Sequence, residues 1–549
     1  MVNPKILLLL ILLSSIKLFA QSNQKLDSEA ITKILYQHTS DDLPGMAVGI
    51  VKEGKIIYEH YLGYANLEHQ VKIDKDTRFN IASDAKQFTA LCILKLIEQG
   101  KLNLNDDFRE YLPDLYKNIQ DKITVSNLIT HSSGIRDYGY LIGLTGKTTW
   151  KQFIDNNDVV TLLKDQEDLN FKPRTEYLYS NSNYILLTEI VKSITGQEFS
   201  EFAKQLFEEL GMANTHFLTN YMAIIPHKAR PYSNWNGWRE EPTLGDVHGD
   251  GALFTTLQDQ LQWEQIVQLN DGKYLAKKII NKSQALLASS IDNGYGYGLE
   301  FGQYGGLKYC YHDGSTGAYN ATFFRFPAKN VSIVVMTNNR SVPTNYLAQQ
   351  LADYILELPA TSSKYPRKPE KIEPLRSTKD LIGIYQNQAN GTIIKIVEKE
   401  GVLFRERYQR DPVKLMFEEG ALFVYENKGR RINFMNVGQT KQKFTLYHPS
   451  IKPETYHRLS NLDSNNFDKK ELIGNFYNKE TDTTISLQYL QDKTYSLTKN
   501  GRERKAALII KYHLRMNSYI INIIRDQDNK VIGLNVSNNR IKNVIFDKI

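Results

Sequence analysis

The stretch Phe79-Asn80-Ile81-Ala82-Ser83-Asp84-Ala85-Lys86-Gln87-Phe88-Thr89-Ala90 decides how the rest of this sequence is interpreted. Its apolar positions predict a long helix over residues 83–99, ended by Gly100. Ser83 and Lys86 are three positions apart, so both lie on one face of that helix. A lysine kept neutral by burial or by a neighbouring cation can take the proton of a serine and make it a nucleophile. The stretch therefore predicts a nucleophile and its base at the start of a buried helix.

The Ser-x-x-Lys spacing is not specific by itself. It occurs also at Ser14/Lys17, Ser22/Lys25 and Ser496/Lys499. Only the copy at Ser83 opens a long apolar helix, where the lysine would be half-buried and free backbone N–H groups would face the serine. The alternative is a helix-capping serine followed by a solvated lysine.

Stretches before and after Ser83 extend the pattern. Leu43-Pro44-Gly45-Met46-Ala47-Val48 and Gly63-Tyr64-Ala65 precede it, and Leu128-Ile129-Thr130-His131-Ser132-Ser133-Gly134-Ile135 follows it. Together with residues 79–90 they resemble the serine β-lactamase and penicillin-binding-protein superfamily, in its class C-like branch with D-aminopeptidases and esterases. The resemblance covers about residues 26–358 and implies an α+β domain, an antiparallel sheet flanked by helices.

The second motif of that family is Tyr-x-Asn, for which this chain offers two candidates. Tyr-Ser-Asn occurs at residues 179–181 and again at residues 232–234. The first copy follows Pro173 and leads into an apolar helix that closes at Gly196, whereas no helix follows the second. We therefore predict that Tyr179 belongs to the site and that Tyr232 is a loop aromatic.

The third motif resembles His312-Asp313-Gly314-Ser315, after a strand-like run. Many penicillin-binding members have lysine at its first position, and the histidine is shared with esterase and D-aminopeptidase relatives. We expect His312 to supply a donor, with a pH-dependent positive charge, near a substrate carboxylate. Gly314 would leave room for the substrate to lie against this strand. The stretch 249–256 also resembles the family pattern, but we interpret it as a turn and a helix start.

These residues together describe an acyl-transfer site. Ser83 attacks a carbonyl, Lys86 accepts its proton, and the Tyr179 hydroxyl relays a proton to the leaving group. Asn181 would bind the substrate's amide and hold Lys86. The oxyanion would lie between the backbone N–H groups of Ser83 and Ser315.

The chain is long enough for several domains, with 549 residues. We predict a signal peptide at 1–20, a serine hydrolase domain at 21–360, a proline- and lysine-rich linker at 361–376, and two all-β modules at 377–461 and 462–549. Leu381-Ile382-Gly383-Ile384-Tyr385 returns as Leu472-Ile473-Gly474-Asn475-Phe476-Tyr477, which indicates a duplication, with a chance echo as the alternative. The modules resemble the small lipocalin-like barrels appended to D-aminopeptidase-like members of the family.

Charge is unevenly distributed between these regions. Residues 361–549 contain 34 Lys and Arg against 21 Asp and Glu, whereas residues 1–360 contain 34 against 40. The basic tail therefore either docks onto the acidic catalytic domain or is attracted to an anionic cell-envelope polymer. We expect docking, because opposite charges within one chain meet first.

The N-terminus is typical of a secretory signal, with Lys5, an apolar run at residues 6–13 and cleavage expected after Ala20. An uncleaved membrane anchor is the alternative. Cys92 and Cys310 lie in apolar stretches and read as two buried thiols rather than one disulfide. No metal-ligand pattern or phosphate-binding loop occurs, so we expect no cofactor, metal, nucleotide or nucleic-acid partner.

Three functions remain open from the sequence. The first is a periplasmic or secreted serine hydrolase of D-amino-acid peptides, small amides or esters. The second is a β-lactamase or D-Ala-D-Ala carboxypeptidase, although no residue dedicated to activating the deacylating water is identifiable. The third is a non-catalytic penicillin- or cell-wall-binding protein that retains the fold.

Overall fold

A computed structural model gives the structure of the chain. It describes residues 27–147, 152–287, 294–358, 371–387, 392–407, 410–425, 430–447, 453–459, 470–490, 494–499, 502–510, 513–516 and 518–549. The expected signal segment 1–20, its cleavage site after Ala20 and most of the expected linker lie outside these residues.

A six-stranded antiparallel sheet organises the first domain, in the order β10-β11-β12-β13-β1-β2. Its strands are β1 (Met46–Lys52), β2 (Lys55–Leu62), β10 (Glu300–Tyr304), β11 (Leu307–Thr316), β12 (Tyr319–Phe326) and β13 (Val331–Thr337). The β1–β2 hairpin turns at Glu53 and Gly54, both with positive φ, as a tight hairpin turn requires. Pairing of Met46 with Thr337 then joins the two ends of the domain.

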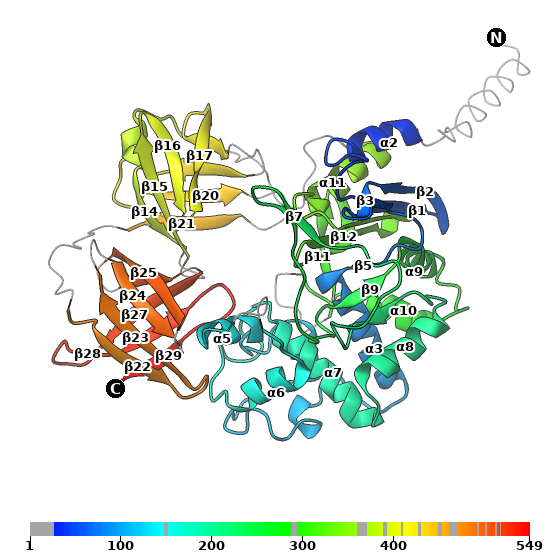
Figure 1. Ribbon diagram of the computed structural model, residues 1–549, viewed down its shortest axis with the longest axis horizontal. Helices are drawn as coiled ribbons and strands as arrows, with labels where there is room; N and C mark the ends of the chain where they lie inside the picture. The colour runs from blue at the N-terminus through cyan, green and yellow to red at the C-terminus, as the bar shows by residue number, and fades with distance from the viewer. Residues whose placement is uncertain are drawn as a thin grey trace, which may run out of the picture.

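Helices cover both faces of this sheet (Figure 1). On one face α2 (Ser28–Leu35) and α11 (Thr344–Ile355) share an apolar cluster with alternate residues of β1, among them Met46 and Val48. On the other face α9 (Leu257–Leu269) packs so closely that a Cβ on Gly49 would lie 2.6 Å from Leu261. This second face carries the larger core, which includes α3 (Lys86–Glu98) and α10 (Lys277–Ser283).

A helical lobe adjoins α3. It consists of α4 (Val125–Ile129), α5 (Tyr138–Leu144), α6 (Asn156–Lys164), α7 (Asn181–Thr195) and α8 (Phe199–Glu209). Both long helices end as predicted, with positive φ at Gly100 after α3 and at Gly196 after α7. Short strands complete the domain: β3 (Tyr64–Asn66), β4 (Val71–Lys72), β5 (Phe79–Asn80), β6 (His216–Phe217), β7 (Tyr232–Asn234), β8 (Trp238–Glu240) and β9 (Leu253–Thr255). The α+β class is thus confirmed.

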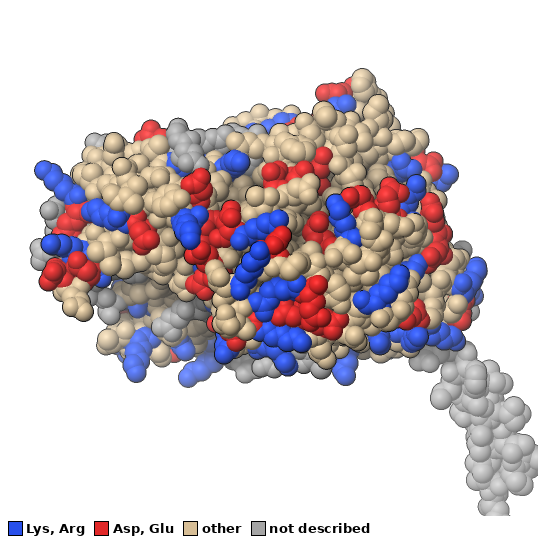
Figure 2. All heavy atoms as spheres, turned by 90° about the horizontal axis from the view of Figure 1, so that it is seen from below, with Lys and Arg blue, Asp and Glu red and all other residues tan. Residues whose placement is uncertain are grey.

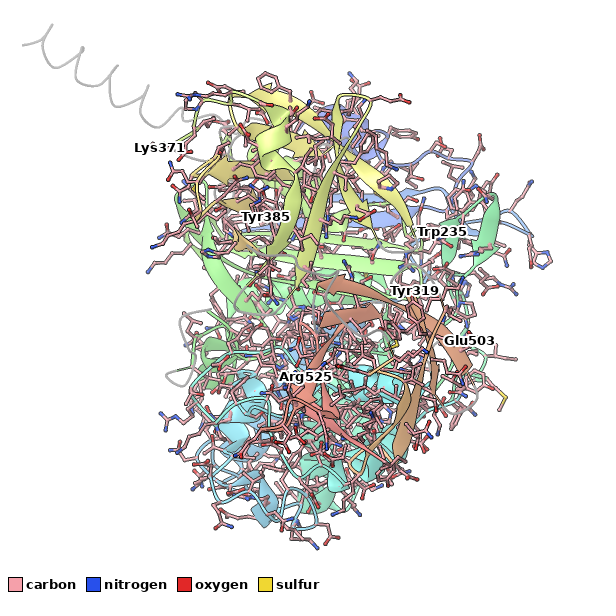
Figure 3. The ribbon with its side chains drawn as sticks, turned by 90° about the vertical axis from the view of Figure 1, so that its left-hand side faces the viewer. Trp235, Tyr319, Lys371, Tyr385, Glu503 and Arg525 are labelled. Carbon is pink, nitrogen blue, oxygen red and sulfur yellow. The ribbon has the colours of Figure 1, made fainter. Side chains whose placement is uncertain are left out.

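Two closed eight-stranded barrels follow. Barrel 1 consists of β14 (Gly383–Gln386), β15 (Ile393–Lys399), β16 (Val402–Arg407), β17 (Arg410–Glu419), β18 (Leu422–Tyr425), β19 (Arg431–Met435), β20 (Lys443–Tyr447) and β21 (Glu454–Arg458). Barrel 2 consists of β22 (Gly474–Asn478), β23 (Thr483–Tyr489), β24 (Thr494–Lys499), β25 (Arg502–Ile510), β26 (His513–Met516), β27 (Tyr519–Arg525), β28 (Val531–Ser537) and β29 (Val544–Lys548). Each barrel begins within one copy of the repeated sequence, and closure leaves no open sheet edge. Figure 3 shows them stacked, with Tyr385 in barrel 1 and Arg525 in barrel 2.

Barrel 2 docks onto the helical lobe beside α5 (Figure 1). The Tyr519 hydroxyl donates to the Tyr140 carbonyl at 2.8 Å, and Lys499 donates to the Gly143 carbonyl at 2.7 Å. A Cβ on Gly143 would lie 2.2 Å from the Tyr519 hydroxyl, so glycine permits this close approach. The predicted docking of the tail is confirmed for this barrel.

The charges at this interface only partly follow the predicted signs. Lys479 pairs with Glu167 and Lys542 with Glu176, as a basic tail on an acidic domain should. The most buried pair is reversed, because Arg136 of the lobe meets Glu480 of the barrel at 2.7 Å. On the face shown in Figure 2, basic and acidic side chains are interspersed rather than gathered into one basic patch.

Candidate active site

Ser83 lies where the sheet meets the helical lobe. It stands in a 3₁₀ turn, Ala82–Ala85, and α3 begins with Lys86, so the first turn of the predicted helix is tighter than an α-helix. Ala82 has φ of +49°, and its N–H donates to the Asn80 side chain at 2.8 Å. This turn holds the serine partly exposed at the head of a buried helix.

Lys86 is fully buried, which contradicts the alternative of a solvated lysine. Its amine donates to the Ser83 hydroxyl at 3.1 Å, to the Asn181 side-chain oxygen at 2.9 Å and to the Asp250 carbonyl at 2.5 Å. Burial is the largest of the effects that lower the pKa of Lys86 to about 8; the cation of Arg540 also lowers it, and the carboxylates of Asp250, Asp137 and Asp84 oppose this. Roughly a tenth of the amine is therefore neutral at pH 7 and can act as a base.

Tyr179 lies beside this amine, with its ring centroid 5.0 Å from the Lys86 nitrogen. The Tyr179 hydroxyl is buried and makes no hydrogen bond to any described residue. Ser83 is nevertheless near enough to lower the pKa of Tyr179. Burial is the larger influence and raises the pKa of Tyr179 well above its usual value. The other candidate, Tyr232, lies in strand β7 and not in the predicted loop, and its hydroxyl accepts a hydrogen bond from the Leu67 N–H at 3.0 Å. The geometry thus brings Tyr179, as predicted, to the serine and lysine.

His312 on β11 is buried and bonded at both ring nitrogens. Nε2 lies 3.0 Å from the Tyr295 hydroxyl, and Nδ1 lies 2.9 Å from the Asp313 carbonyl. Since that carbonyl can only accept, we assign the proton to Nδ1. Burial lowers the pKa of His312 to about 3, so the imidazole is neutral at physiological pH. The positive charge predicted here is absent, and substrate binding by His312 stays a prediction.

Gly314 allows the β11 backbone to lie close to the turn that carries Ser83, a contact that the sequence does not predict. A Cβ at this position would lie 2.0 Å from the Ile81 carbonyl and 2.7 Å from the Asp84 carboxylate. The glycine therefore makes room for the turn that carries Ser83, and its role in substrate binding stays a prediction. Ser315 is exposed. It lies on the part of β11 that follows Tyr311, the last residue of β11 that pairs with β10. The oxyanion site between the N–H groups of Ser83 and Ser315 stays a prediction.

Asp250 lies in the site, although the sequence predicts only a turn at this position. Its carbonyl bonds Lys86, and its carboxylate accepts from the Tyr138 hydroxyl at 3.0 Å. Burial raises the pKa of Asp250 above its ordinary value. The helix start is correctly predicted, since Thr256 caps α9. The two glycines around Asp250 were the available signal of a close backbone approach.

Arg540 enters the site from barrel 2. Its guanidinium carbon lies 4.6 Å from the centroid of the Tyr179 ring, and one nitrogen lies 3.4 Å from the Asp137 carboxylate. No sequence motif links Arg540 to Tyr179, and only the docking of the barrel brings them together. The structure thus adds a cation to the predicted site.

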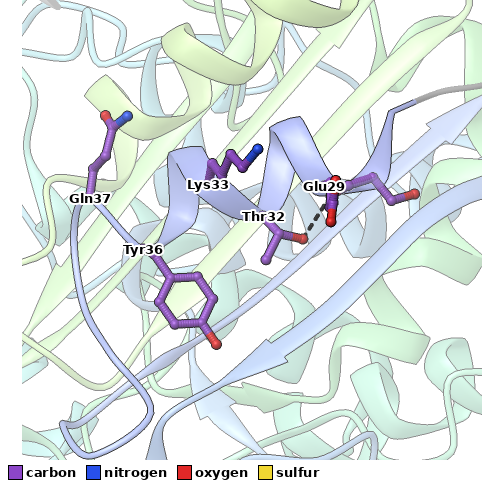
Figure 4. Close-up of a pocket in the computed structure, with 6 residues that line it drawn as sticks. Glu29, Thr32, Lys33, Tyr36 and Gln37 are labelled. Atoms are coloured by element: carbon purple, nitrogen blue, oxygen red, sulfur yellow. Dashed lines mark hydrogen bonds between the residues drawn. The ribbon is translucent and has the colours of Figure 1, made fainter.

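Neither a metal site nor a membrane span is found in the described residues. Cys92 and Cys310 are free and buried, as predicted. A shallow open pocket runs along α2, on the face of the sheet opposite α3 (Figure 4). It is lined by Ser28, Glu29, Thr32, Lys33, Tyr36 and Gln37 and contains none of the catalytic candidates.

A buried lysine bonded to a serine at a helix start, on a sheet flanked by helices, defines a serine hydrolase of the β-lactamase and penicillin-binding-protein superfamily. Residues 28–355 match the family model described as Beta-lactamase, and the chain belongs to that family.

The chain is also similar to several known proteins. Protein flp of Staphylococcus aureus (strain COL) is 30% identical over 353 residues, which are 62% of this chain and 68% of that protein. The D-aminopeptidase of Brucella melitensis is 24% identical over 383 residues, 68% of this chain and 69% of that protein. Among solved structures, the octameric penicillin-binding protein homologue from Pyrococcus abyssi superposes with a TM-score of 0.58 and 24% identity, over 79% of this chain and all of that one. This last likeness concerns the fold alone.

Proposed function

We propose that the protein hydrolyses peptides containing D-amino acids, small amides or esters through a covalent acyl-enzyme on Ser83. The observation that carries the proposal is the fully buried Lys86 amine, 3.1 Å from the Ser83 hydroxyl and with its pKa lowered to about 8. A serine needs such a base to become a nucleophile at neutral pH.

The reaction follows from these contacts. Neutral Lys86 accepts the proton of Ser83 while Oγ bonds to the carbonyl carbon of the substrate. The N–H groups of Ser83 and Ser315 stabilise the oxyanion that forms. When the bond to the leaving group breaks, the proton passes from Lys86 through the Tyr179 hydroxyl to the leaving nitrogen or oxygen. Water then attacks the acyl-enzyme and gives a proton to the same base. As the ester bond to Ser83 breaks and the acid is released, that proton returns to Ser83 Oγ and Lys86 is neutral again.

Asn181 supports the choice of an amide or peptide substrate. Its side-chain oxygen accepts from Lys86, which leaves its amide N–H groups to donate to a substrate carbonyl. The D-aminopeptidase relative and the histidine in the third motif favour D-amino-acid substrates over β-lactams.

We also propose that the protein is periplasmic or secreted. The support is Lys5 followed by the apolar run at residues 6–13 and Ala20 at the expected cleavage position. N-terminal sequencing of the protein expressed with its own leader should begin at Gln21. An intact N-terminus on membrane-bound protein would instead indicate an anchor.

A fluorophosphonate probe tests the nucleophile. Mass spectrometry should locate the adduct on the peptide containing Ser83, and Ser83→Ala should abolish it. Ser496→Ala is the matched control, because Ser496 precedes Lys499 at the same spacing yet lies in barrel 2. An adduct that survives in Ser83→Ala would refute the proposal. A folded wild type that is never labelled would favour a non-catalytic binder.

A substrate panel tests the specificity. N-acylated D- and L-alanine p-nitroanilides, simple esters and a chromogenic cephalosporin should be compared by kcat/KM. We expect the D-configured amides or the esters to be turned over fastest. Faster cephalosporin hydrolysis than any amide or ester would favour a β-lactamase instead.

A further inference from the structure

The turn between β28 and β29 is built to hold Arg540 against the catalytic domain. Within the turn, the Asn538 side-chain oxygen accepts from the N–H groups of Arg540 at 2.7 Å and Ile541 at 2.9 Å. From the lobe, Asn170 donates to the Arg540 carbonyl at 3.1 Å and accepts from the Lys542 N–H at 2.6 Å. The backbone on both sides of Arg540 is therefore fixed, and its side chain is directed into the site.

The Arg540 guanidinium lies beside two aromatic rings. Its central carbon lies 4.6 Å from the centroid of Tyr179 and 6.0 Å from that of Tyr140. Flat guanidinium groups stack on such faces and keep their edges available for hydrogen bonds. The side chain remains 30% exposed, so solvent and solutes still reach it.

The ion pair that Arg540 makes does not use its donors fully. Its contact with the Asp137 carboxylate is long, at 3.4 Å, and that carboxylate already accepts from the N–H groups of Gly139 at 3.0 Å and Asn181 at 2.9 Å. Among the described residues, no second acceptor for the guanidinium is found. Arginine offers five donors in a fork that matches a carboxylate, so most of its hydrogen-bonding capacity is unused.

We propose that Arg540 is the anion-binding residue of this active site and selects substrates with a carboxylate on the acyl side of the scissile bond. We assign the carboxylate to the acyl side for the following reason. Arg540 contacts the Asp137 carboxylate, which accepts a hydrogen bond from the Asn181 N–H. Asn181 is the residue proposed to bind the substrate's amide. This inference rests on the proposed function. It also gives the site the cation that His312, neutral and bonded at both nitrogens, does not provide.

The proposal separates this protein from an aminopeptidase. A substrate with a free α-ammonium group would bring a second positive charge beside Arg540, and like charges in a partly desolvated site repel. The Asp137 carboxylate offers little compensation, since three donors already share it. D-Amino-acid substrates should therefore be preferred when their nitrogen is acylated by a group that ends in a carboxylate.

Three substrates with one leaving group test this preference. N-succinyl-D-alanine p-nitroanilide carries the carboxylate, N-butyryl-D-alanine p-nitroanilide replaces it with a methyl group, and D-alanine p-nitroanilide carries the ammonium group. For wild type, kcat/KM should be highest for the anionic compound and lowest for the cationic one. A charge-assisted hydrogen-bonded contact predicts an anionic-to-neutral ratio of roughly tenfold to a hundredfold.

Arg540→Gln should bring that ratio close to one. The ratio is the readout because loss of the Arg540 cation also changes the pKa of Lys86 and hence the rate on every substrate. Lys542→Gln is the matched control, because it removes one positive charge from the same turn. The Lys542 amine pairs with Glu176 at the surface and does not enter the site. It should keep the wild-type ratio, and equal melting temperatures would show that both variants are folded and docked.

Each contrary outcome has a defined meaning. An unchanged ratio in Arg540→Gln, or a wild type that prefers the neutral or cationic compound, would overturn the role of Arg540. An equal rise in kcat/KM on all three substrates in Arg540→Gln would also overturn it, and would indicate that the Arg540 side chain only obstructs the site. Where turnover is slow, the same ratio is read from how strongly each compound slows fluorophosphonate labelling of Ser83. Absence of both turnover and labelling would instead refute the proposed function.

Discussion

Arg136 holds barrel 2 on the catalytic domain, and its replacement by methionine offers a direct test of the docked arrangement. Its side chain is 1% exposed and reaches Glu480 of the barrel at 2.7 Å. It also donates to the carbonyls of Lys542 at 3.3 Å and Asn543 at 3.2 Å, at the end of the turn that carries Arg540. Arg136→Met keeps an apolar stem but leaves the Glu480 carboxylate without its counter-charge.

The cost of this change is set by how buried Glu480 is. Its side chain is 12% exposed, and it retains two backbone donors, the N–H groups of Glu167 and Asp168. Removing one partner of a buried ion pair costs about 3 to 5 kcal/mol, and the retained donors place this case near 3 kcal/mol. Since Glu480 is hydrated once the barrel separates, the whole cost falls on the docked state.

Native-state hydrogen exchange measures this docking free energy. The amide of Lys542, which bonds the Asn170 side chain across the interface, is the reporter. A loss of about 3 kcal/mol should speed its exchange by roughly a hundredfold, while amides in the central sheet should keep their protection. The double variant Arg136→Met/Glu480→Gln should recover part of the loss, because no stranded charge remains.

Two results would refute this reasoning. Unchanged exchange at Lys542 in Arg136→Met would mean that the buried pair does not hold the barrel. Equal acceleration in the central sheet would mean that the variant unfolds the catalytic domain rather than releasing the barrel.

Three further predictions concern the catalytic groups. The rate of Ser83 labelling should rise with pH and level off above about 8, because burial lowers the pKa of Lys86 to about 8 and only the neutral amine is a base; a rise centred near the ordinary value of 10.5 would contradict this. Tyr179→Phe should reduce kcat by roughly a hundredfold or more, as loss of a proton relay does, whereas Tyr232→Phe should change it little; the reverse ranking, in the same steady-state assay, would exclude Tyr179. Gly314→Ala should abolish labelling without a large loss of melting temperature, because its Cβ would meet the Ile81 carbonyl at 2.0 Å and displace the Ser83 turn; normal labelling would disprove this close contact.

Local features of the fold could be predicted from the sequence. The β1–β2 hairpin was visible because Glu53-Gly54 separates two strand-like runs, and α7 because an apolar period ends at Gly196. The duplication is recognisable because the first strand of each barrel begins in a repeated sequence, at residues 381–385 and 472–477. These features depend on neighbours in the chain, where periodicity and turn residues carry the information.

The electrostatics of the site could not be predicted in the same way. The charge of His312 depends on burial and on Tyr295, which lies in a segment without any motif. Arg540 is one of many basic residues in the tail, and nothing nearby in sequence distinguishes it. Both properties arise only when distant segments pack, so a motif can identify the residue type and its position but not its charge state or its partners.

The position of Arg540 links substrate selection to the docking of barrel 2. A group that binds an anion in the docked state but not in the separated state must, by thermodynamic reciprocity, stabilise docking when the anion binds. The buried Arg136–Glu480 pair and the Asn170 contacts therefore contribute to specificity without touching substrate, since they set the fraction of molecules in which Arg540 faces Tyr179. A lysine on β11 would make the anion site independent of the barrel. With a neutral His312 on β11, the cation comes from a separate module, and stability of the interface becomes a determinant of the reaction.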